Sequence, residues 1–182
     1  MRDIAIVGHG QSLIGAELGD YIDSHDHVLR FAKDPTDAIV EMKTEDFGDL
    51  IDILLYTETG KKRLHLDPRS EYEHAEHWIY DKSCGPDLDW LEKYQKYKRP
   101  DRAGHLSRGT AAVIMAAKAG YEDINLFGFD NIMNGNNEHY LSCFRDLKLT
   151  KKYHDYVAER RIIDRVTYEH GLKLECLPQS PP

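Results

Sequence analysis

The sequence is poor in the features that mark membrane, secreted and disulfide-bonded proteins. Its 182 residues contain no apolar run long enough to span a bilayer, and the apolar segment 4–7 is too short for a signal peptide. The three cysteines are odd in number and widely separated, which argues against a disulfide scaffold. We therefore expect a reduced, cytoplasmic protein without a membrane span.

Linkers and an excess of positive charge are also missing. No stretch rich in proline, glycine or serine divides the chain, so we expect one domain over residues 1–178 and a disordered tail over 179–182. The 32 acidic residues outnumber the 24 basic ones, and the net charge of −8 argues against nucleic acid as a partner. A local basic spot can still bind a small anion.

What the chain does contain is an alternation of short apolar runs and helical patterns. Six runs have the length and composition of buried strands: 4–8, 27–32, 51–56, 76–81, 124–129 and 172–177. Helical patterns cover residues 13–22, 88–97, 109–120 and 151–170. Gly120 and Gly171 stand where glycines end helices. This alternation predicts an α/β fold, a single Rossmann-like domain with a mostly parallel, twisted sheet and helices on both faces.

A glycine turn follows the first predicted strand. It consists of Gly8, His9, Gly10, Gln11 and Ser12. At the carboxyl edge of a parallel sheet, such a turn leads into a helix start whose N–H groups and dipole favour anions. The glycines let the backbone approach a ligand, and the other three side chains carry hydrogen-bond donors. We expect a phosphate site; a tight turn that only leads the chain into a helix is the alternative.

A second helix start is expected to point at the same edge of the sheet. An alanine-rich helical pattern begins there, and we assign its body, residues 111–117, to the core. Its free N–H groups and the end of the following strand could meet the first turn around one ligand. The residues concerned are Ser107, Arg108 and Gly109 at the helix start, and Gly128, Phe129 and Asp130 at the strand end.

Two histidines late in the chain are candidates for chemistry. His139 follows a loop rich in Asn and Gly, and loops on a rigid scaffold often carry functional residues. His154 falls near the start of the last helical pattern, where the helix dipole favours a neutral imidazole that can act as a base. Glu159 lies about 140° further around an ideal helix, so spacing alone does not make a dyad. Solvent-exposed histidines are the alternative.

Four stretches resemble, in order, the sialylmotifs of the eukaryotic-type sialyltransferases, glycosyltransferase family 29. They span most of the chain, and their combination is more specific than any one of them. The stretches are residues 7–36 with their continuation 45–56 for motif L, 107–130 for motif S, 138–140 for motif III, and 154–159 for motif VS.

The resemblance implies a GT-A-like variant of the Rossmann-like fold and a metal-independent, inverting glycosyltransferase. Its donor would be a CMP-sugar carrying sialic acid or a related ketosugar such as Kdo, and its acceptor a glycan hydroxyl. Residues 8–12 would hold the phosphate, and the motif S residues would lie near the cytidine. His139 would contact the donor phosphate, and His154 would be the general base. Glu159 would orient or support other groups rather than react itself. The CMP-sugar is a substrate, so no cofactor is implied.

The sequence departs from the family pattern at several positions. His9 replaces the usual Asn of the turn, Ala32 replaces a second Asn, and Arg108 replaces the middle Thr of Ser-Thr-Gly. The cysteines that join motifs L and S in secretory members are missing, and Tyr121 stands at the later position. Besides an active transferase, two interpretations therefore stay open: a nucleotide-binding module without transfer, and an interaction domain that keeps only the fold.

Overall fold

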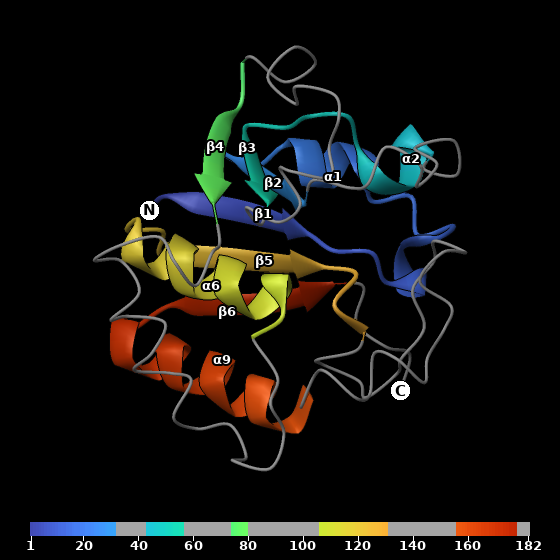
Figure 1. Ribbon diagram of the computed structural model, residues 1–182. Helices are drawn as coiled ribbons and strands as arrows, with labels where there is room; N and C mark the ends of the chain where they lie inside the picture. The colour runs from blue at the N-terminus through green and yellow to red at the C-terminus, as the bar shows by residue number, and fades with distance from the viewer. Residues whose placement is uncertain (32–42, 57–73, 80–105, 131–155, 178–182) are drawn as a thin grey trace.

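Six parallel strands form one sheet in the computed structural model (Figure 1), which describes residues 1–31, 43–56, 74–79, 106–130 and 156–177. The elements are β1 (Asp3–Val7), η1 (Gln11–Leu13), α1 (Gly19–Asp23), β2 (Val28–Phe31), α2 (Thr44–Phe47), β3 (Ile53–Tyr56), β4 (Glu76–Ile79), α6 (Arg108–Lys118), β5 (Asp123–Phe127), α9 (Tyr156–His170) and β6 (Lys173–Leu177). The strand order is β4-β3-β2-β1-β5-β6. The predicted α/β class is therefore confirmed, and every pairing between the described strands is parallel.

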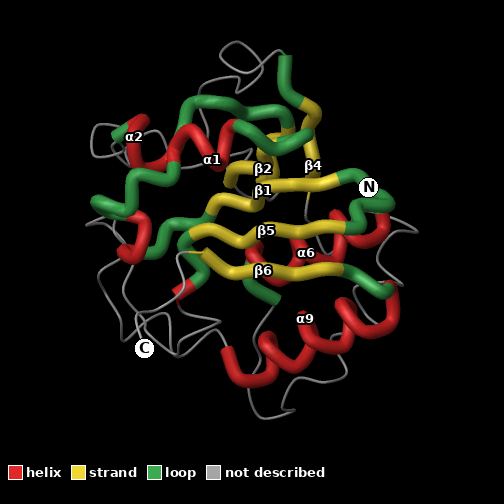
Figure 2. The backbone as a smooth tube through the Cα atoms, turned by 180° about the vertical axis from the view of Figure 1, so that it is seen from behind, coloured by secondary structure: helices red, strands yellow, loops and turns green. Residues whose placement is uncertain are grey.

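Alternate residues of the strands pack against different helices. On one face, Ile4 and Ile6 of β1 share a core cluster with residues of α6 and α9. On the other face, Ala5 and Val7 share a second cluster with residues of η1, α1 and α2. Figure 2 shows the sheet from behind, with β1, β5 and β6 side by side. Helices on both faces were predicted, and this arrangement confirms them.

All six strands predicted from the apolar runs are present. The helical pattern 109–120 becomes α6, whose N-cap is Ser107, and Gly120 follows it with a φ of +84°. The last helical pattern becomes α9 from Tyr156 onward, and Gly171 after it has a φ of +60°. The predicted helix 88–97, the start of the last helix and the tail 179–182 lie outside the described residues.

The predicted continuous helix over residues 13–22 is wrong. The chain forms the short 3-10 helix η1, leaves it, and begins α1 only at Gly19. The cause lies in the connection, where Gly15 and Glu17 have φ values of +73° and +53°. These left-handed conformations interrupt a right-handed helix. A buried carboxylate of α2 stabilises this break, as described below.

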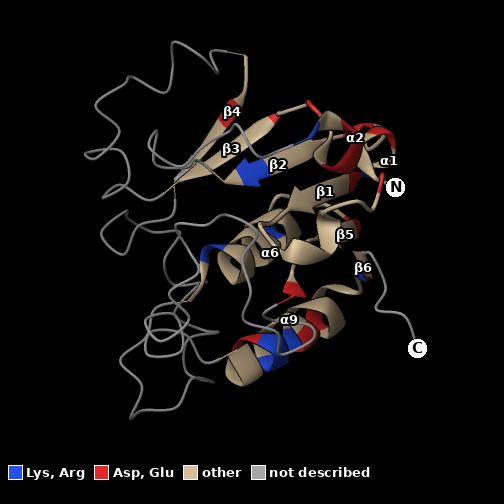
Figure 3. Cartoon of the chain, turned by 90° about the vertical axis from the view of Figure 1, so that its right-hand side faces the viewer, with Lys and Arg blue, Asp and Glu red and all other residues tan. Residues whose placement is uncertain are grey.

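The outer face of α9 carries charged side chains, and its inner face is apolar apart from the buried Glu159. Arg160 pairs with Asp164 at 2.8 Å and Arg165 pairs with Glu169 at 2.6 Å, each one helical turn apart. Figure 3 shows basic and acidic positions, in blue and red, along α9. Ile162 lies on the inner face, in the core cluster shared with α6. In the part of the chain that is described, no helix combines the length and apolarity needed to cross a membrane.

Candidate functional site

The candidate site lies where the order of the strands along the sheet reverses. From β1 the chain order proceeds outward through β2, β3 and β4 on one side, whereas β5 and β6 lie on the other. In open α/β sheets, ligands bind at the carboxyl ends of the strands that flank such a switch point. Here those strands are β1 and β5, so residues 8–12 (the β1 turn) and residues 128–130 (the β5 end) emerge side by side, as the sequence predicted.

Backbone hydrogen bonds join the β1 turn to the β5 end. The N–H of Gly8 donates to the Phe127 carbonyl at 2.7 Å, and the N–H of Gly10 donates to the Gly128 carbonyl at 2.9 Å. A Cβ added at either Gly8 or Gly10 would lie 2.6 Å from the Gly128 oxygen. The glycines are therefore needed for the close approach of these two protein segments, whereas the sequence analysis had assigned them to the approach of a ligand.

Asp130 ties down the middle of the β1 turn. This carboxylate is buried, accepts the Ser12 N–H at 2.9 Å through Oδ2, and accepts the Ser12 hydroxyl at 2.5 Å through Oδ1. Both donors of Ser12 are thus directed at Asp130, and the hydroxyl oxygen keeps lone pairs that can accept a hydrogen bond. A direct contact of Ser12 with a ligand stays a prediction. In such a contact the Ser12 hydroxyl oxygen would accept a hydrogen bond from the ligand, because both donors of Ser12 are already used.

The ring of Phe129 brings the start of α6 to the same place. A Cβ added at Gly109 would lie 2.8 Å from Cε1 of this ring, and one added at Gly8 would lie 3.1 Å from Cδ2. Phe129 is 8% exposed, and its ring centroid is 6.5 Å from that of Phe31 on β2. The β1 turn and the first turn of α6 therefore pack on opposite edges of one aromatic side chain, so the predicted convergence of two helix starts is present in the structure.

Two nitrogen-rich side chains flank Phe31 beside this aromatic pair. The His9 ring lies edge-on, with 6.0 Å between ring centroids, and the Arg108 guanidinium carbon lies 6.0 Å from the centroid of Phe31. His9 comes from the β1 turn and Arg108 from the first residue of α6. Both side chains are half-buried. An anion bound beside Phe31 would lie near one guanidinium and one imidazole that come from different elements.

Glu159 supports the start of α6 from below. Its carboxylate on α9 is fully buried, accepts the Ser107 N–H at 3.1 Å and the Thr110 hydroxyl at 2.6 Å, and also accepts the Ser107 hydroxyl. The Ser107 hydroxyl in turn accepts the Thr110 N–H at 3.2 Å as the N-cap. A supporting role for Glu159 is what the resemblance implied, and these contacts agree with it.

Several predicted residues lie outside the described parts of the chain, namely His139, His154 and Ala32. Tyr121 is described and buried, with the Arg2 guanidinium 4.2 Å from its ring centroid. Among the described residues, no three His, Cys, Asp or Glu side chains are grouped as metal ligands would be.

Sequence reasoning missed two residues of this site. Phe31 stood in a predicted strand. The apolar pattern of a strand indicates that a residue is buried, but it does not show that the residue lies next to a binding site. Thr110 follows Ser107 by three residues, a spacing typical of N-terminal capping, and that spacing could have identified it as part of the helix start. Its pairing with Glu159 spans 49 positions of the sequence and has no local signal.

No family model and no curated protein matches the sequence. Solved structures do match. The sialyltransferase CstII from Campylobacter jejuni in complex with trisaccharide acceptor and CMP has a TM-score of 0.64 at 14% identity, over 97% of this chain and 81% of that one. An α-2,3-sialyltransferase from the same organism, in apo form, has a TM-score of 0.62 at 13% identity, over 99% and 76%.

A mammalian sialyltransferase in complex with Gal-β-1-3GalNAc-ortho-nitrophenol is similar as well. Its TM-score is 0.57 at 18% identity, over 95% of this chain and 68% of that one. At such identities the likeness concerns the fold. Bacterial and mammalian structures match over nearly the whole of this chain, and the chain therefore has the sialyltransferase fold.

Proposed function

We propose that the chain is a glycosyltransferase that transfers sialic acid, or a related ketosugar such as Kdo, from a CMP-sugar to a glycan hydroxyl. The observation that carries this proposal is the convergence of the β1 turn, the α6 start and the β5 end around Phe129. Support comes from the shared fold, since CstII, a sialyltransferase with that fold, has been solved with CMP. A reduced, cytoplasmic setting is part of the proposal.

The donor phosphate would lie between the β1 turn and the start of α6. The dipole of α6 favours an anion at the start of this helix, and the Arg108 guanidinium would add a full positive charge. The rings of Phe31 and Phe129 are both buried, with 6.5 Å between their centroids, so the phosphate would lie next to apolar surface, where electrostatic contacts are stronger than in water. The β5 end, Gly128 to Asp130, would border the nucleoside.

The transfer itself would invert the anomeric carbon. The acceptor oxygen attacks that carbon as the bond to the phosphate oxygen breaks, and CMP leaves with the bonding electron pair. His154 would take the proton of the acceptor hydroxyl, and protonated His139 would stabilise the charge that grows on the phosphate. The helix start and Arg108 would face this charge, so we propose a mechanism without a divalent metal.

The alternative is a module that binds CMP without transfer. One observation favours it. Ser12 donates both of its hydrogen bonds to Asp130, which leaves fewer groups to stabilise the charge that grows on the phosphate during transfer. The replacements at His9 and Arg108 point in the same direction. Binding of CMP would then persist while a CMP-sugar and an acceptor glycan stay unchanged.

Calorimetry and turnover together distinguish these possibilities. CMP and CMP-sialic acid are titrated into the wild type and into His154→Ala, and release of CMP is followed with a glycan acceptor, with and without a chelator. We expect both proteins to bind CMP, only the wild type to turn over, and the chelator to have no effect. Equal turnover in the two proteins would exclude His154 as the base, and binding without turnover in the wild type would establish the alternative.

A further inference from the structure

The chain leaves the β1 turn through a segment with an unusual backbone. Residues 14–18, the exit segment, connect η1 to α1, and within them Gly15 and Glu17 have positive φ values. Among the described residues, Glu17 is the one non-glycine residue in this region of φ. Such a conformation persists only where the surroundings hold it, because an L-residue there is strained.

The carboxylate of Asp46 on α2 holds the exit segment. Its Oδ2 accepts the Gly15 N–H at 2.9 Å, and its Oδ1 accepts the Glu17 N–H at 3.1 Å. Asp46 is buried, so both of its oxygens are committed to these two residues of the exit segment. The Gly15 N–H is the main cause that keeps the pKa of Asp46 below its ordinary value, against the opposing effect of burial.

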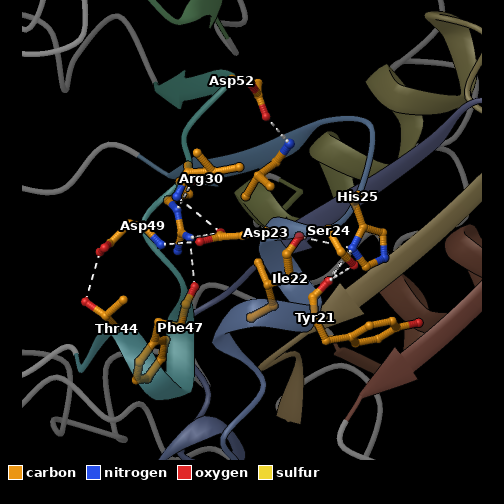
Figure 4. Close-up of polar contacts among 12 residues, drawn as sticks. Tyr21, Ile22, Asp23, Ser24, His25, Arg30, Thr44, Phe47, Asp49 and Asp52 are labelled. Atoms are coloured by element: carbon orange, nitrogen blue, oxygen red, sulfur yellow. Dashed lines mark hydrogen bonds and ion pairs between the residues drawn. The ribbon is translucent and has the colours of Figure 1, made fainter.

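Helix α2 is itself fixed against the body of the protein. Arg30 on β2 donates to the Phe47 carbonyl at 2.7 Å and lies 3.6 Å from the Asp23 carboxylate of α1 (Figure 4). The backbones of α1 and α2 also touch, since a Cβ at Gly19 would lie only 2.0 Å from the Thr44 carbonyl oxygen. Asp46 therefore acts from a rigid position.

The exit segment and the β5 end hold the β1 turn from two directions. Leu13, which ends η1, is fully buried and shares a core cluster with Phe47 of α2. Its Cδ1 would lie 2.8 Å from a Cβ at Gly128. Asp130 holds Ser12 within η1, and Asp46 holds Gly15 and Glu17 in the exit segment that follows. One buried carboxylate thus holds the chain before Leu13 and another holds it after Leu13.

We propose that Asp46 is a positioning residue for nucleotide binding: it fixes the exit segment and so preorganises the β1 turn without touching the ligand. The inference rests on the proposed function for the identity of the ligand, CMP. It adds to that function a residue 34 positions beyond Ser12 that no spacing in the sequence connects to the turn. A turn that is already ordered loses less conformational entropy when a ligand binds.

The test compares Asp46→Asn with Glu45→Gln, which neutralises an exposed neighbour on the same helix. An asparagine can accept only one of the two N–H groups and directs its own N–H₂ at the other. We expect the affinity for CMP, measured by calorimetry, to fall about tenfold in Asp46→Asn and to stay unchanged in Glu45→Gln. Gly15→Ala strains the backbone of the exit segment itself, because Gly15 has a φ of +73°, and this variant should lower the affinity for CMP as Asp46→Asn does.

Hydrogen exchange separates positioning from general support of the fold. In Asp46→Asn, the Gly10 and Ser12 amides should exchange faster, while the amides of β5 and β6 keep their rates. Unchanged CMP affinity in folded Asp46→Asn and Gly15→Ala would overturn the inference, and so would a uniform rise in exchange across the sheet. If the wild type itself does not bind CMP, the proposed function fails, and the exchange pattern alone decides whether Asp46 positions the turn.

Discussion

Replacing Gly10 by alanine tests how closely the β1 turn and the β5 end approach one another. The added Cβ would lie 2.6 Å from the Gly128 carbonyl oxygen and 2.6 Å from Oδ2 of Asp130. The backbone itself accepts alanine, since Gly10 has a φ of −73° and a ψ of 147°. The effect is therefore steric, and the two segments must separate by about 0.8 Å before the contact reaches the 3.4 Å of ordinary van der Waals distances.

That separation lengthens three hydrogen bonds across the site. They are the bond from the Gly10 N–H to Gly128 and the two bonds from Ser12 to Asp130. With about 1 kcal/mol for each bond and a further 1 kcal/mol for overpacking, the free energy of unfolding should fall by about 2–4 kcal/mol. For a chain of this length, the melting temperature should drop by roughly 10 °C. We also expect CMP affinity to fall by about tenfold or more.

The control is Gly120→Ala, at the end of α6. Nothing lies within 4 Å of a Cβ there, but the φ of +84° strains any residue with a side chain. This variant should lose about 1 kcal/mol of stability and keep its CMP affinity. Thermal unfolding and calorimetry are measured on both variants. The reasoning is refuted if Gly10→Ala melts within about 2 °C of the wild type and binds CMP equally well.

Three further predictions concern side chains that are wholly or partly buried. Glu159→Gln should lower the free energy of unfolding by about 2–4 kcal/mol in urea titrations, because the donors at the α6 start lose a charged partner; a loss below about 0.5 kcal/mol would contradict this. The Gly15 N–H is the main cause of the lowered pKa of Asp46, so this carboxylate stabilises the fold above its ordinary pKa of 3.8 and loses that contribution as the pH falls through the lowered value. Acid unfolding of Asp46→Asn should therefore depend less on pH below about pH 4 than that of Glu45→Gln. Partial burial raises the pKa of Cys176 to about 12, so alkylation of this thiol at pH 8, followed by peptide mass analysis, should be slower in the folded protein than in urea; equal rates would count against this effect of partial burial.

Local pattern was sufficient to predict the sheet. The four inner strands are short, largely apolar runs bounded by polar or turn residues, and buried parallel strands have this composition because both of their faces are covered, whereas the edge strands β4 and β6 mix apolar and polar residues. The same kind of reasoning failed for residues 13–22. Their apolar spacing fits a helix, but Gly15 and Glu17 adopt left-handed conformations that Asp46 stabilises from 29 or more positions away.

The candidate site was predictable in its place and not in its internal contacts. A topological rule brings the turn after β1 and the end of β5 to one edge, so the sequence could place these two segments at one site. The contacts of Asp130 with Ser12 and of Glu159 with Ser107 join residues 118 and 52 positions apart. Such pairs depend on the packed structure, and no periodicity or spacing encodes them.

The most direct test of one shared site is the change in backbone amide NMR shifts on addition of CMP. The amides of the β1 turn, of Arg108 and Gly109 at the start of α6, and of Phe129 at the β5 end should all shift and saturate with a single dissociation constant. The amides of Asp26 and Asp52, at the amino ends of β2 and β3, should stay in place. Shifts confined to one of the three segments, or centred on the amino ends of the strands, would contradict the account.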